Sequence, residues 1–380
     1  MKPYDVQVRG AGLVGHALAL SLARIGLRVA LVPEAAPKTA EPRGPDVRAF
    51  ALNAASVGLL RGLKVWDALP PNAATPVHEM RVHGDAPGAA LEFSSWEQRV
   101  GELAWIVDAA VLERELASAV RFSPHVTVLN ATANAGPPDA AQAELTAICE
   151  GKGSTTREAH RVPLDRRPYG HRAIAARLTS SKPHAGTARQ WFRSPDVLAL
   201  LPFDSPQPGS SYALVWSVPD ARADVLLAMD ATAFADALMQ ATGGEAGELH
   251  LSGERAAWPL LRAQASVWCG PGWVLVGDAA HVVHPLAGQG LNLGLADVAA
   301  LTEVLAAREP WRDLGDDRLL RRYARQRLSP TRAMIEITDG LMQLFAHPAP
   351  VVRELRNRGL SLVNRLTPIK RWLTARALDS

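Results

Sequence analysis

Residues 4–32 read YDVQVRGAGLVGHALALSLARIGLRVALV, and this stretch decides the fold. Tyr4–Arg9 is typical of a short buried strand, and Leu27–Val32 of a second one. Between them, residues 16–25 form an Ala/Leu-rich run typical of a helix, which Gly26 ends. A strand, a glycine turn, a helix and a strand within about 30 residues make the βαβ unit that binds dinucleotides. The sequence therefore predicts an α/β fold that begins with a Rossmann-like domain.

The turn between the first strand and the helix is GAGLVG at residues 10–15, a GxGxxG pattern. Gly10 is expected to make the tight turn, Gly12 to let the backbone approach a pyrophosphate, and Gly15 to let the helix pack on the strand. The N-terminus of the helix would direct its partial positive charge at the phosphates. The cofactor-binding residues predicted here are Gly10, Gly12, Leu13, Val14 and Gly15.

Two residues depart from the usual form of this unit. Arg9 stands where an aliphatic residue is expected before the first glycine, and Pro33 stands where the second strand usually ends in an acidic residue. Glu34 follows one place later. Its carboxylate either reaches the adenosine ribose or is a solvated loop charge, and we count it among the cofactor-binding candidates.

A second glycine-rich stretch, WVLVGDAAHVVHPLAGQGLNLGL, occupies residues 273–295. A buried strand at Trp273–Val276 leads into Gly277 and Asp278, and a Pro/Gly loop then precedes a helix at about Leu291–Ala307. Asp278 offers a carboxylate to a hydroxyl group, while the loop presents backbone N–H groups at a helix N-terminus. This pattern indicates a strand end that binds a phosphate or a sugar.

The string GDAAHVVHPLAGQGLNLGL resembles the second FAD-binding motif of the aromatic-ring flavoprotein monooxygenases, which share the fold of para-hydroxybenzoate hydroxylase. In particular it is similar to the ubiquinone-biosynthesis hydroxylases (UbiH/UbiF-like). Asp46–Leu52, DVRAFAL, resembles the DxRAxAL segment of that family, whose arginine lies near the flavin. The resemblance covers almost the whole chain, since the family pattern also continues through residues 63–69, 167–171, 182–203 and 368–373.

The resemblance implies FAD as the cofactor, with its pyrophosphate on residues 10–15 and a ribitol hydroxyl on Asp278. Arg48 would lie near the flavin, and the loop that begins at Pro285 would wrap the isoalloxazine edge with backbone N–H groups. The implied flavin-facing loop is Pro285, Leu286, Ala287 and Gly288. The further implied cofactor-binding residues are Gly277, Gln289, Gly290, Leu291 and Asn292.

The same resemblance implies the reaction. NAD(P)H would reduce the flavin, oxygen would add to give a flavin C4a-hydroperoxide, and an electron-rich phenolic ring would take one oxygen atom. No side chain is assigned as an acid, base or nucleophile, because the protein has to orient the ring and exclude water. The implied substrates are molecular oxygen and a hydrophobic polyprenylated phenol of ubiquinone biosynthesis.

Two alternatives stay open. One is the same chemistry on another aromatic substrate, and the other is a non-oxidising FAD-binding assembly subunit of a biosynthetic complex. The second rests on Arg9, on Pro33 and on the segment Cys149–Arg157. There the family carries GADGxxSxxR, whose aspartate is implicated in NAD(P)H binding, and we place Lys152 at the position of this aspartate. That departure puts direct use of a nicotinamide in doubt.

Few residues suggest any other chemistry. His281 and His284 have a spacing that can bind a metal, but the family string accounts for both and no third ligand is near in sequence, so we predict no metal. Cys149 and Cys269 cannot make a disulfide framework, which favours a reducing, cytoplasmic setting. No run of 18 apolar residues predicts a transmembrane helix. Asp108 is expected to cap the helix that follows it.

The charge of the chain is unevenly distributed. The 41 Lys and Arg residues and 38 Asp and Glu residues leave a net charge of +3. Residues 321–380 carry 12 basic and 4 acidic side chains, whereas the first 320 residues carry 29 and 34. A basic tail on an acidic body argues against a nucleic-acid partner and favours a tethered surface contact. We predict that residues 348–380 contact the inner membrane face or a biosynthetic complex, the alternative being a helix packed on its own body.

The chain is expected to consist of interleaved parts. The FAD-binding domain takes residues 1–75, 95–160 and 267–315. A substrate domain with a mixed β-sheet takes residues 76–94 and 161–266, and a helical C-terminal region takes 316–380. The substrate-domain strands predicted from alternation are Val77–Val82, Arg172–Leu178 and Tyr212–Val218. Residues 130–142 are expected to form a surface loop, and residues 316–345 and 348–378 to be helical.

Overall fold

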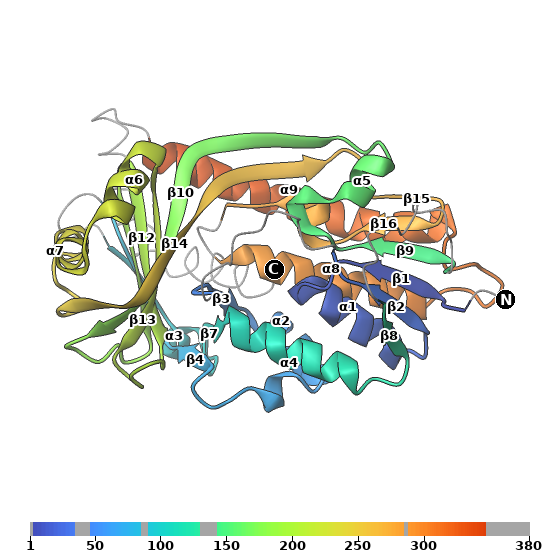
Figure 1. The fold of residues 1–380 in the computed structure, drawn as a ribbon, viewed down its shortest axis with the longest axis horizontal. Helices are drawn as coiled ribbons and strands as arrows, with labels where there is room; N and C mark the ends of the chain where they lie inside the picture. Colours follow the sequence, from blue (N-terminus) through green and yellow to red (C-terminus); the bar gives the residue numbers. More distant parts are fainter. Residues whose placement is uncertain (1–2, 35–45, 85–89, 130–142, 285–287, 347–380) are drawn as a thin grey trace.

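The computed structural model of the protein describes residues 3–34, 46–84, 90–129, 143–284 and 288–346 (Figure 1). The predicted loop at 130–142, the flavin-facing residues 285–287 and the basic segment 348–380 lie outside these residues. Within the described part, two large sheets lie at opposite ends of the molecule, with helices packed around them.

The first sheet is parallel except at one edge, as the βαβ unit predicts. Its strand order is β15-β16-β9-β1-β2-β8, and β15 is antiparallel to β16. Val6, Val8, Val29 and Leu31 are fully buried in its centre, because both faces of a parallel sheet are covered. The strands are β1 (Val6–Arg9), β2 (Val29–Val32), β8 (Val126–Val128), β9 (Leu145–Ile148), β15 (Cys269–Gly270) and β16 (Trp273–Leu275).

Helices pack against this sheet and against one another, α1 on α4 and α8, and α8 on α9. Helix α1 begins at Leu13, three residues before the predicted start. Gly15 fits into its first turn because it has no side chain that would meet the Gly10 carbonyl. Asp108 caps α4 as predicted, since its Oδ1 accepts a hydrogen bond from the Val111 N–H at 3.0 Å. These helices are α1 (Leu13–Arg24), α2 (Ala54–Gly62), α4 (Ala109–Arg121), α8 (Gln289–Ala306) and α9 (Asp317–Ala346).

The second sheet is mixed and has the order β17-β14-β10-β13-β12-β11-β5-β6. Its two longest strands, β10 and β14, pair with each other and run between the two ends of the molecule (Figure 1). The predicted strand Arg172–Leu178 is only part of β10, because register shifts at 168–172 and 176–178 interrupt the alternation on which the prediction rests. The strands are β5 (Glu79–His83), β6 (Ala90–Ser94), β10 (Leu164–Ser180), β11 (Thr187–Arg193), β12 (Asp196–Phe203), β13 (Ser211–Pro219), β14 (Leu249–Ala265) and β17 (His281–Val282).

The predicted single strand Val77–Val82 is wrong, because this segment contributes to two strands in different sheets. Strand β4 (Ala74–Val77) belongs to a three-stranded sheet of order β3-β7-β4, with β3 (Ala49–Leu52) and β7 (Ala104–Asp108). Between β4 and β5, the backbone N–H of His78 turns away and donates to the Gly186 carbonyl at 2.9 Å. Along the chain, β5 and β6 lie between β4 and β7 of the small sheet, yet they pair in the mixed sheet. This gives the predicted interleaved fold. The exact domain limits stay a prediction.

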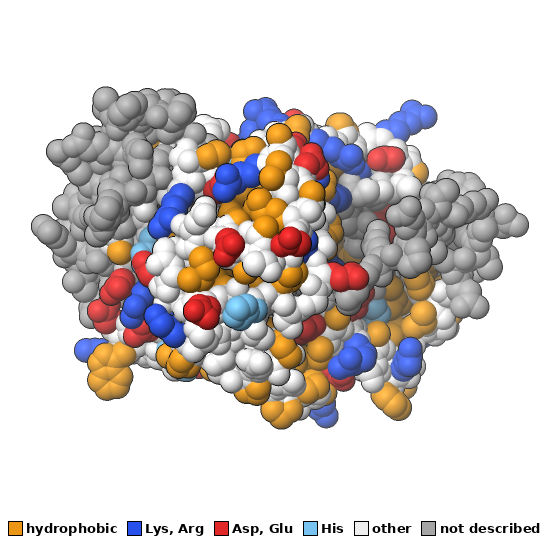
Figure 2. Space-filling model, turned by 60° about the vertical axis from the view of Figure 1, so that its left-hand side comes forward, with side chains coloured by type: hydrophobic (Ala, Val, Ile, Leu, Met, Phe, Trp, Pro, Cys, Tyr) orange, Lys and Arg blue, Asp and Glu red, His pale blue; other side chains and the backbone are white. Residues whose placement is uncertain are grey.

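Helices α6 (Asp220–Ala228) and α7 (Ala231–Thr242) cover one face of the mixed sheet and bury Trp216, Phe234 and Leu238 there. Figure 2 turns this end of the molecule toward the viewer and shows acidic, basic and apolar side chains interspersed over it. None of the helices in the described ranges has the length and apolar character needed to cross a bilayer. The short elements are α3 (Ser95–Gln98), α5 (Thr155–Ala159), η1 (Trp66–Ala68), η2 (Gly151–Gly153) and η3 (Gly277–Ala279).

Candidate active site

The candidate site is a cavity of about 1610 Å³ between the first sheet and the inner face of the mixed sheet. Pockets for drug-sized ligands measure roughly 300–1000 Å³, so this cavity has room for a larger molecule or for two molecules together. We name its two sides by what lines them. The cavity-lining residues of the polar wall are 9, 32–34, 46–48, 150–153, 278 and 288–292, and we include in this wall the glycine turn 10–15, which follows Arg9, and Asp297, which bonds the backbone beside Asp278. The roof is formed by cavity-lining residues of β10–β14.

The glycine turn has the geometry that its spacing predicts. Gly10 has a φ of +102°, and a Cβ on it would lie 2.4 Å from the Cys149 carbonyl oxygen. A Cβ on Gly15 would lie 1.9 Å from the Gly10 carbonyl oxygen, so only glycine allows the helix to approach this closely. Around Gly12 there is open space to 4 Å, which leaves its backbone accessible to a phosphate.

Val14 joins the two glycine-rich segments of the sequence. Leu13 and Val14 are partly buried at the start of α1. A Cβ on Gly277 would lie 3.3 Å from the Val14 side chain, and one on Gly294 only 2.7 Å from it. The start of α1, the end of β16 and helix α8 therefore meet at glycines, which brings the two predicted cofactor-binding stretches together.

Asp278 follows β16 in the turn η3 and lines the cavity. Desolvation by the surrounding protein raises the pKa of its carboxyl, and the nearby charges of His281, Lys152 and Arg48 partly offset this effect. When ionised, the carboxylate accepts hydrogen bonds from a ligand hydroxyl group.

A buried cluster around Asp297 of α8 holds the turn that carries Asp278. Asp297 Oδ2 accepts the Gly277 N–H at 3.0 Å and lies 2.7 Å from His281 Nε2, while Oδ1 accepts from Arg327 Nε at 2.7 Å. Burial opposes ionisation of Asp297, but the charges and hydrogen bonds of His281 and Arg327 outweigh it and lower the pKa of this carboxyl. Asp297 is thus a buried anion that fixes the backbone beside Asp278.

Helix α8 directs its N-terminus at the cavity. Gly288 precedes it with a φ of +63°, and a Cβ there would lie 3.0 Å from the Ala51 Cβ. Gly288, Gln289, Gly290 and Leu291 line the cavity, and Gly290 has open space to 4 Å. The free N–H groups of this first turn carry partial positive charge, which suits a phosphate or the edge of a reduced flavin ring.

Asn292 ties the start of α8 to the neighbouring elements. Its Nδ2 donates to the Ala51 carbonyl at 2.8 Å, and its Oδ1 accepts from the Asn53 N–H at 3.1 Å and from Ser56 Oγ at 2.8 Å. Asn53 in turn caps α2. Asn292 therefore fixes β3 and α2 against α8 in addition to lining the cavity.

Part of the roof is a patch of small apolar side chains, while Arg189, Gln190, Glu254 and Arg255 also line it. Ala175 of β10 is in register with Ala256 of β14 and with Val215 of β13, which is in register with Ala199 of β12. Ala173 lies two residues from Ala175 on the same face. Because small residues occupy successive strands, the roof leaves volume over an apolar surface, as an aromatic ring with an apolar substituent requires.

The FAD binding domain family matches residues 3–338 of the chain. The ubiquinone hydroxylase UbiL of Rhodospirillum rubrum is 30% identical over all of this chain and 90% of its own length. The 3-demethoxyubiquinol 3-hydroxylase of Escherichia coli is 31% identical over 99% of both chains. The chain belongs to the FAD-binding family of the ubiquinone hydroxylases.

Solved structures share the fold of this ubiquinone hydroxylase family member. Pseudomonas aeruginosa PqsL in complex with 2-aminobenzoylacetate has a TM-score of 0.74 and 21% identity, covering 94% of this chain and 99% of its own. Klebsiella pneumoniae HpxO complexed with FAD and uric acid has a TM-score of 0.72 and 17% identity, covering 98% of both chains. These structures confirm the predicted fold class, and the match to the FAD binding domain family confirms the FAD cofactor.

The residues of the polar wall fit FAD on their own geometry. The backbone at Gly12 and Gly290 is open to a ligand. Asp278 is exposed and offers an acceptor on the wall of a cavity large enough for the extended cofactor. The contacts of each residue with FAD stay predictions. This includes Pro33 and Glu34, which line the cavity just beyond β2, with Glu34 exposed.

The placement of Lys152 at the family's aspartate is wrong. Counting back four residues from Ser154, or seven from Arg157, puts that aspartate at position 150, where this chain has Glu150. The Glu150 carboxylate accepts from Ser154 Oγ at 2.7 Å and from the Thr156 N–H and Oγ1 at 2.9 and 2.6 Å. The ubiquinone hydroxylase pattern therefore keeps its acid here, and Lys152 is a separate cation on the cavity wall.

Arg9, the other departure, pairs with this acid. Arg9 Nε donates to Glu150 Oε1 at 3.0 Å, which joins the end of β1 to the turn after β9. Burial opposes ionisation of Glu150, but its hydrogen bonds to Thr156, Ser154 and Arg9 outweigh this and lower the pKa of the carboxyl. Arg9 thus has a structural partner in the polar wall.

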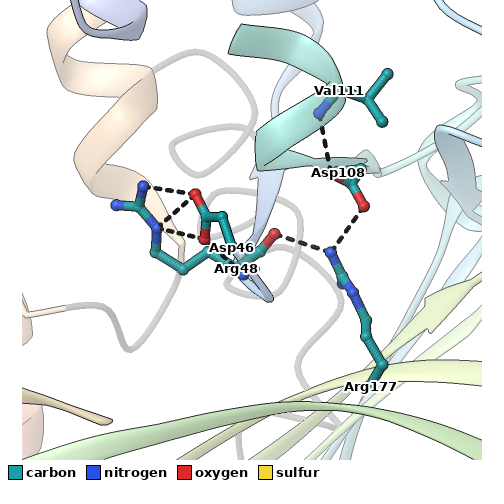
Figure 3. Close-up of polar contacts among 5 residues, drawn as sticks. All are labelled: Asp46, Arg48, Asp108, Val111 and Arg177. Atoms are coloured by element: carbon teal, nitrogen blue, oxygen red, sulfur yellow. Dashed lines mark hydrogen bonds and ion pairs between the residues drawn. The ribbon is translucent and has the colours of Figure 1, made fainter. Parts of the chain in front are cut away.

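Arg48 lies on the polar wall, where a bidentate pair with Asp46 holds it (Figure 3). Arg48 Nη2 donates to Asp46 Oδ2 at 2.7 Å and Nε donates to Oδ1 at 2.9 Å. The guanidinium carbon is 5.8 Å from the ring centroids of both Phe50 and Trp258. Since Trp258 belongs to β14, Arg48 lies where the polar wall meets the roof.

His281 and His284 have different surroundings. His281 pairs with Asp297 and stacks on Trp268 with a centroid distance of 5.0 Å. His284 is buried edge-to-face with Tyr169, and burial lowers the pKa of its imidazole to about 3. Among the residues that the structure describes, no group of three or more His, Cys, Asp or Glu is placed to hold a metal ion.

The sequence alone does not reveal the parts played by Asp297, Arg327 and Glu150. A signal exists for Asp297, because an acid inside the apolar run LGLADVAAL of a helix is costly to bury without partners. Its partner Arg327 is 30 residues away, and Glu150 is 141 residues from Arg9, so local patterns cannot pair them.

Proposed function

We propose that this chain hydroxylates the aromatic ring of a polyprenylated phenol in ubiquinone biosynthesis, with FAD as its cofactor. The observation that carries the proposal is a cavity in which a wall that fits FAD faces a roof with a patch of small apolar side chains. Relatives named ubiquinone hydroxylase and 3-demethoxyubiquinol 3-hydroxylase support the choice of substrate.

FAD bound in the cavity supplies the electrons that activate oxygen for transfer to the ring. The glycine turn presents N–H groups to the pyrophosphate, and Asp278 accepts a hydrogen bond from the ribitol chain. The N-terminus of α8 stabilises negative charge at the edge of the ring system. The roof places the phenol over this edge and excludes water, with no acid or base assigned.

We propose NAD(P)H as the electron donor. The correction at residue 150 supports this, because the family's acidic position is filled by Glu150. The alternative of a non-oxidising assembly subunit is weakened too. Two of its reasons are the departures at Arg9 and in the segment Cys149–Arg157, and Arg9 pairs with Glu150 in that segment.

The deciding experiment uses the purified, FAD-loaded chain with NADH or NADPH and a short-chain prenylated phenol. We expect substrate-dependent NAD(P)H oxidation and a product heavier by one oxygen atom. A variant with Asp278→Asn tests whether the activity depends on the polar wall. Reduction by dithionite only, with no response to NAD(P)H, would instead favour the assembly subunit or an external reductase.

The substrate is identified by complementation. The chain is expressed in bacterial strains that each lack one ring hydroxylase of ubiquinone biosynthesis, and the accumulated intermediates are measured. We expect ubiquinone to be restored in one of these strains. Turnover of simple phenols together with failure in every strain would favour another aromatic substrate.

We also propose that residues 348–380 contact an anionic membrane surface or a biosynthetic complex at the cytoplasmic side. Seven Lys and Arg residues in this segment and the bilayer location of a polyprenyl substrate support the proposal. Co-sedimentation with phosphatidylglycerol-containing liposomes is expected for the full chain and should disappear when residues 348–380 are deleted. Equal binding by both forms would rule this role out.

A further inference from the structure

Arg177 connects the roof to the polar wall (Figure 3). It lies on β10, in register with Ala213 of β13, and its side chain crosses to the segment that leads into β3. Its Nη2 donates to the Arg48 carbonyl at 2.9 Å and to Asp108 Oδ2 at 3.0 Å. A single nitrogen from the mixed sheet therefore contacts two elements on the other side of the cavity.

Both acceptors of Arg177 have a second structural role. The Arg48 carbonyl also accepts the Ala109 N–H at 3.2 Å, and the other carboxylate oxygen of Asp108 caps α4 through the Val111 N–H. Arg177 thus completes a junction between β10, the start of β3 and the start of α4.

Burial of the Arg177 side chain restricts the positions that its guanidinium can take. Arg177 is 9% exposed, and its guanidinium carbon lies 4.0 Å from the centroid of the Phe203 ring. A buried guanidinium is destabilising unless it is paired, so the contacts with Asp108 and Arg48 determine where this side chain can lie.

The backbone of Arg48 is what this junction holds. Its carbonyl is fixed by Arg177 and Ala109, and its guanidinium is fixed separately by Asp46. The position of the guanidinium on the polar wall therefore depends on where the junction places the main chain.

We propose that Arg177 is a positioning residue for FAD, which acts through the backbone of Arg48 and couples the roof to the polar wall. The inference rests on the assignment of Arg48 to FAD binding in the proposed function. It does not depend on which phenol is hydroxylated.

The test measures the FAD dissociation constant by titrating apoprotein with FAD and following flavin fluorescence, which needs no phenol. Arg177→Met removes both hydrogen bonds and keeps an apolar contact with Phe203, and we expect FAD to bind about fivefold more weakly. Arg177→Lys should restore most of the affinity, because one ammonium group can donate to both oxygens that Nη2 serves.

The matched control is Arg172→Met on the same strand. Arg172 pairs with Asp224 of α6 at 2.6 Å, on the face of the mixed sheet that α6 covers and away from the cavity, so its loss should leave the FAD affinity unchanged. If Arg177→Met does not fold, Asp108→Asn serves instead, since asparagine retains the helix cap but loses the charge that pairs with Arg177.

A double-variant cycle tests the route through Arg48. We expect Arg48→Met with Arg177→Met to bind FAD as weakly as Arg48→Met alone. Additive losses, or a lower melting temperature of Arg177→Met with unchanged FAD affinity, would overturn the positioning role while leaving the proposed function intact. No effect of Arg48→Met would remove Arg48 from the FAD site and the inference with it.

Discussion

The polar wall and the roof of the cavity are built in different ways. On the polar wall, single atoms are specified: a Cβ on Gly15 would lie 1.9 Å from the Gly10 carbonyl oxygen, and Asp297 has three partners. On the roof, alanines from adjacent strands specify volume and apolar character. The difference teaches that residue identity matters on the polar wall, whereas side-chain size matters on the roof.

The largest effect is expected at Asp297. Asp297→Ala leaves the buried partners Arg327 and His281 without their anion, and removing one member of a buried pair costs about 3–5 kcal/mol. Urea unfolding of the apoprotein measures this loss. Asp297→Asn, which can still accept the Gly277 N–H, should lose less; equal stability of Asp297→Ala and the parent chain would contradict the importance of this cluster.

A somewhat smaller effect separates two glycines of one turn. Gly15→Ala places a Cβ against the Gly10 carbonyl and should destabilise the apoprotein by ~3 kcal/mol through overpacking. Gly12→Ala meets open space in the apoprotein, so it should retain stability and weaken FAD binding. Thermal unfolding and FAD titration of both variants distinguish effects on the fold from effects on cofactor binding. A stability loss in Gly12→Ala and none in Gly15→Ala would contradict the roles given to these two glycines.

Acid stability depends on the polar wall through Asp297. Its pKa is lowered in the folded chain, so its contribution to stability is present above the ordinary value of 3.8 and is lost as the pH falls through the lower folded value. Each unit of pKa shift corresponds to about 1.4 kcal/mol. The unfolding free energy of the parent chain should therefore fall more steeply below about pH 4 than that of Asp297→Asn. Parallel pH curves would refute this.

The smallest effect on stability is expected on the roof. Ala175 lines the cavity, so the larger side chain of Ala175→Leu can extend into it, and we expect ~1 kcal/mol or less of destabilisation and unchanged FAD affinity. The KM for phenols with bulky apolar substituents should rise more than that for small phenols. A loss of FAD binding in this variant would show that the roof is not independent of the polar wall.

The parts of the site that sequence predicts are those with local causes. The GxGxxG spacing, the position of Asp278 after a buried strand and the Asp108 cap each depend on a few neighbouring residues, and the structure places each of them as expected. The pairing of Arg177 with Arg48 crosses 129 residues and depends on the tertiary fold. The misplacement of Lys152 has a simpler cause: both Glu150 and Lys152 are followed by a glycine, so the family's Asp-Gly pair can be aligned two residues too late.

Strand β10 contacts the polar wall at two main-chain carbonyls. Arg166 donates to the Lys152 carbonyl at 2.8 Å, and Arg177 donates to that of Arg48 at 2.9 Å. The register shift at residues 168–172 lies between these arginines and helps to set the direction in which each side chain points. Inserting or deleting one residue there would turn one of the arginines away from its carbonyl. In the evolution of this protein, the number of residues in β10 between 166 and 177 is therefore expected to stay constant.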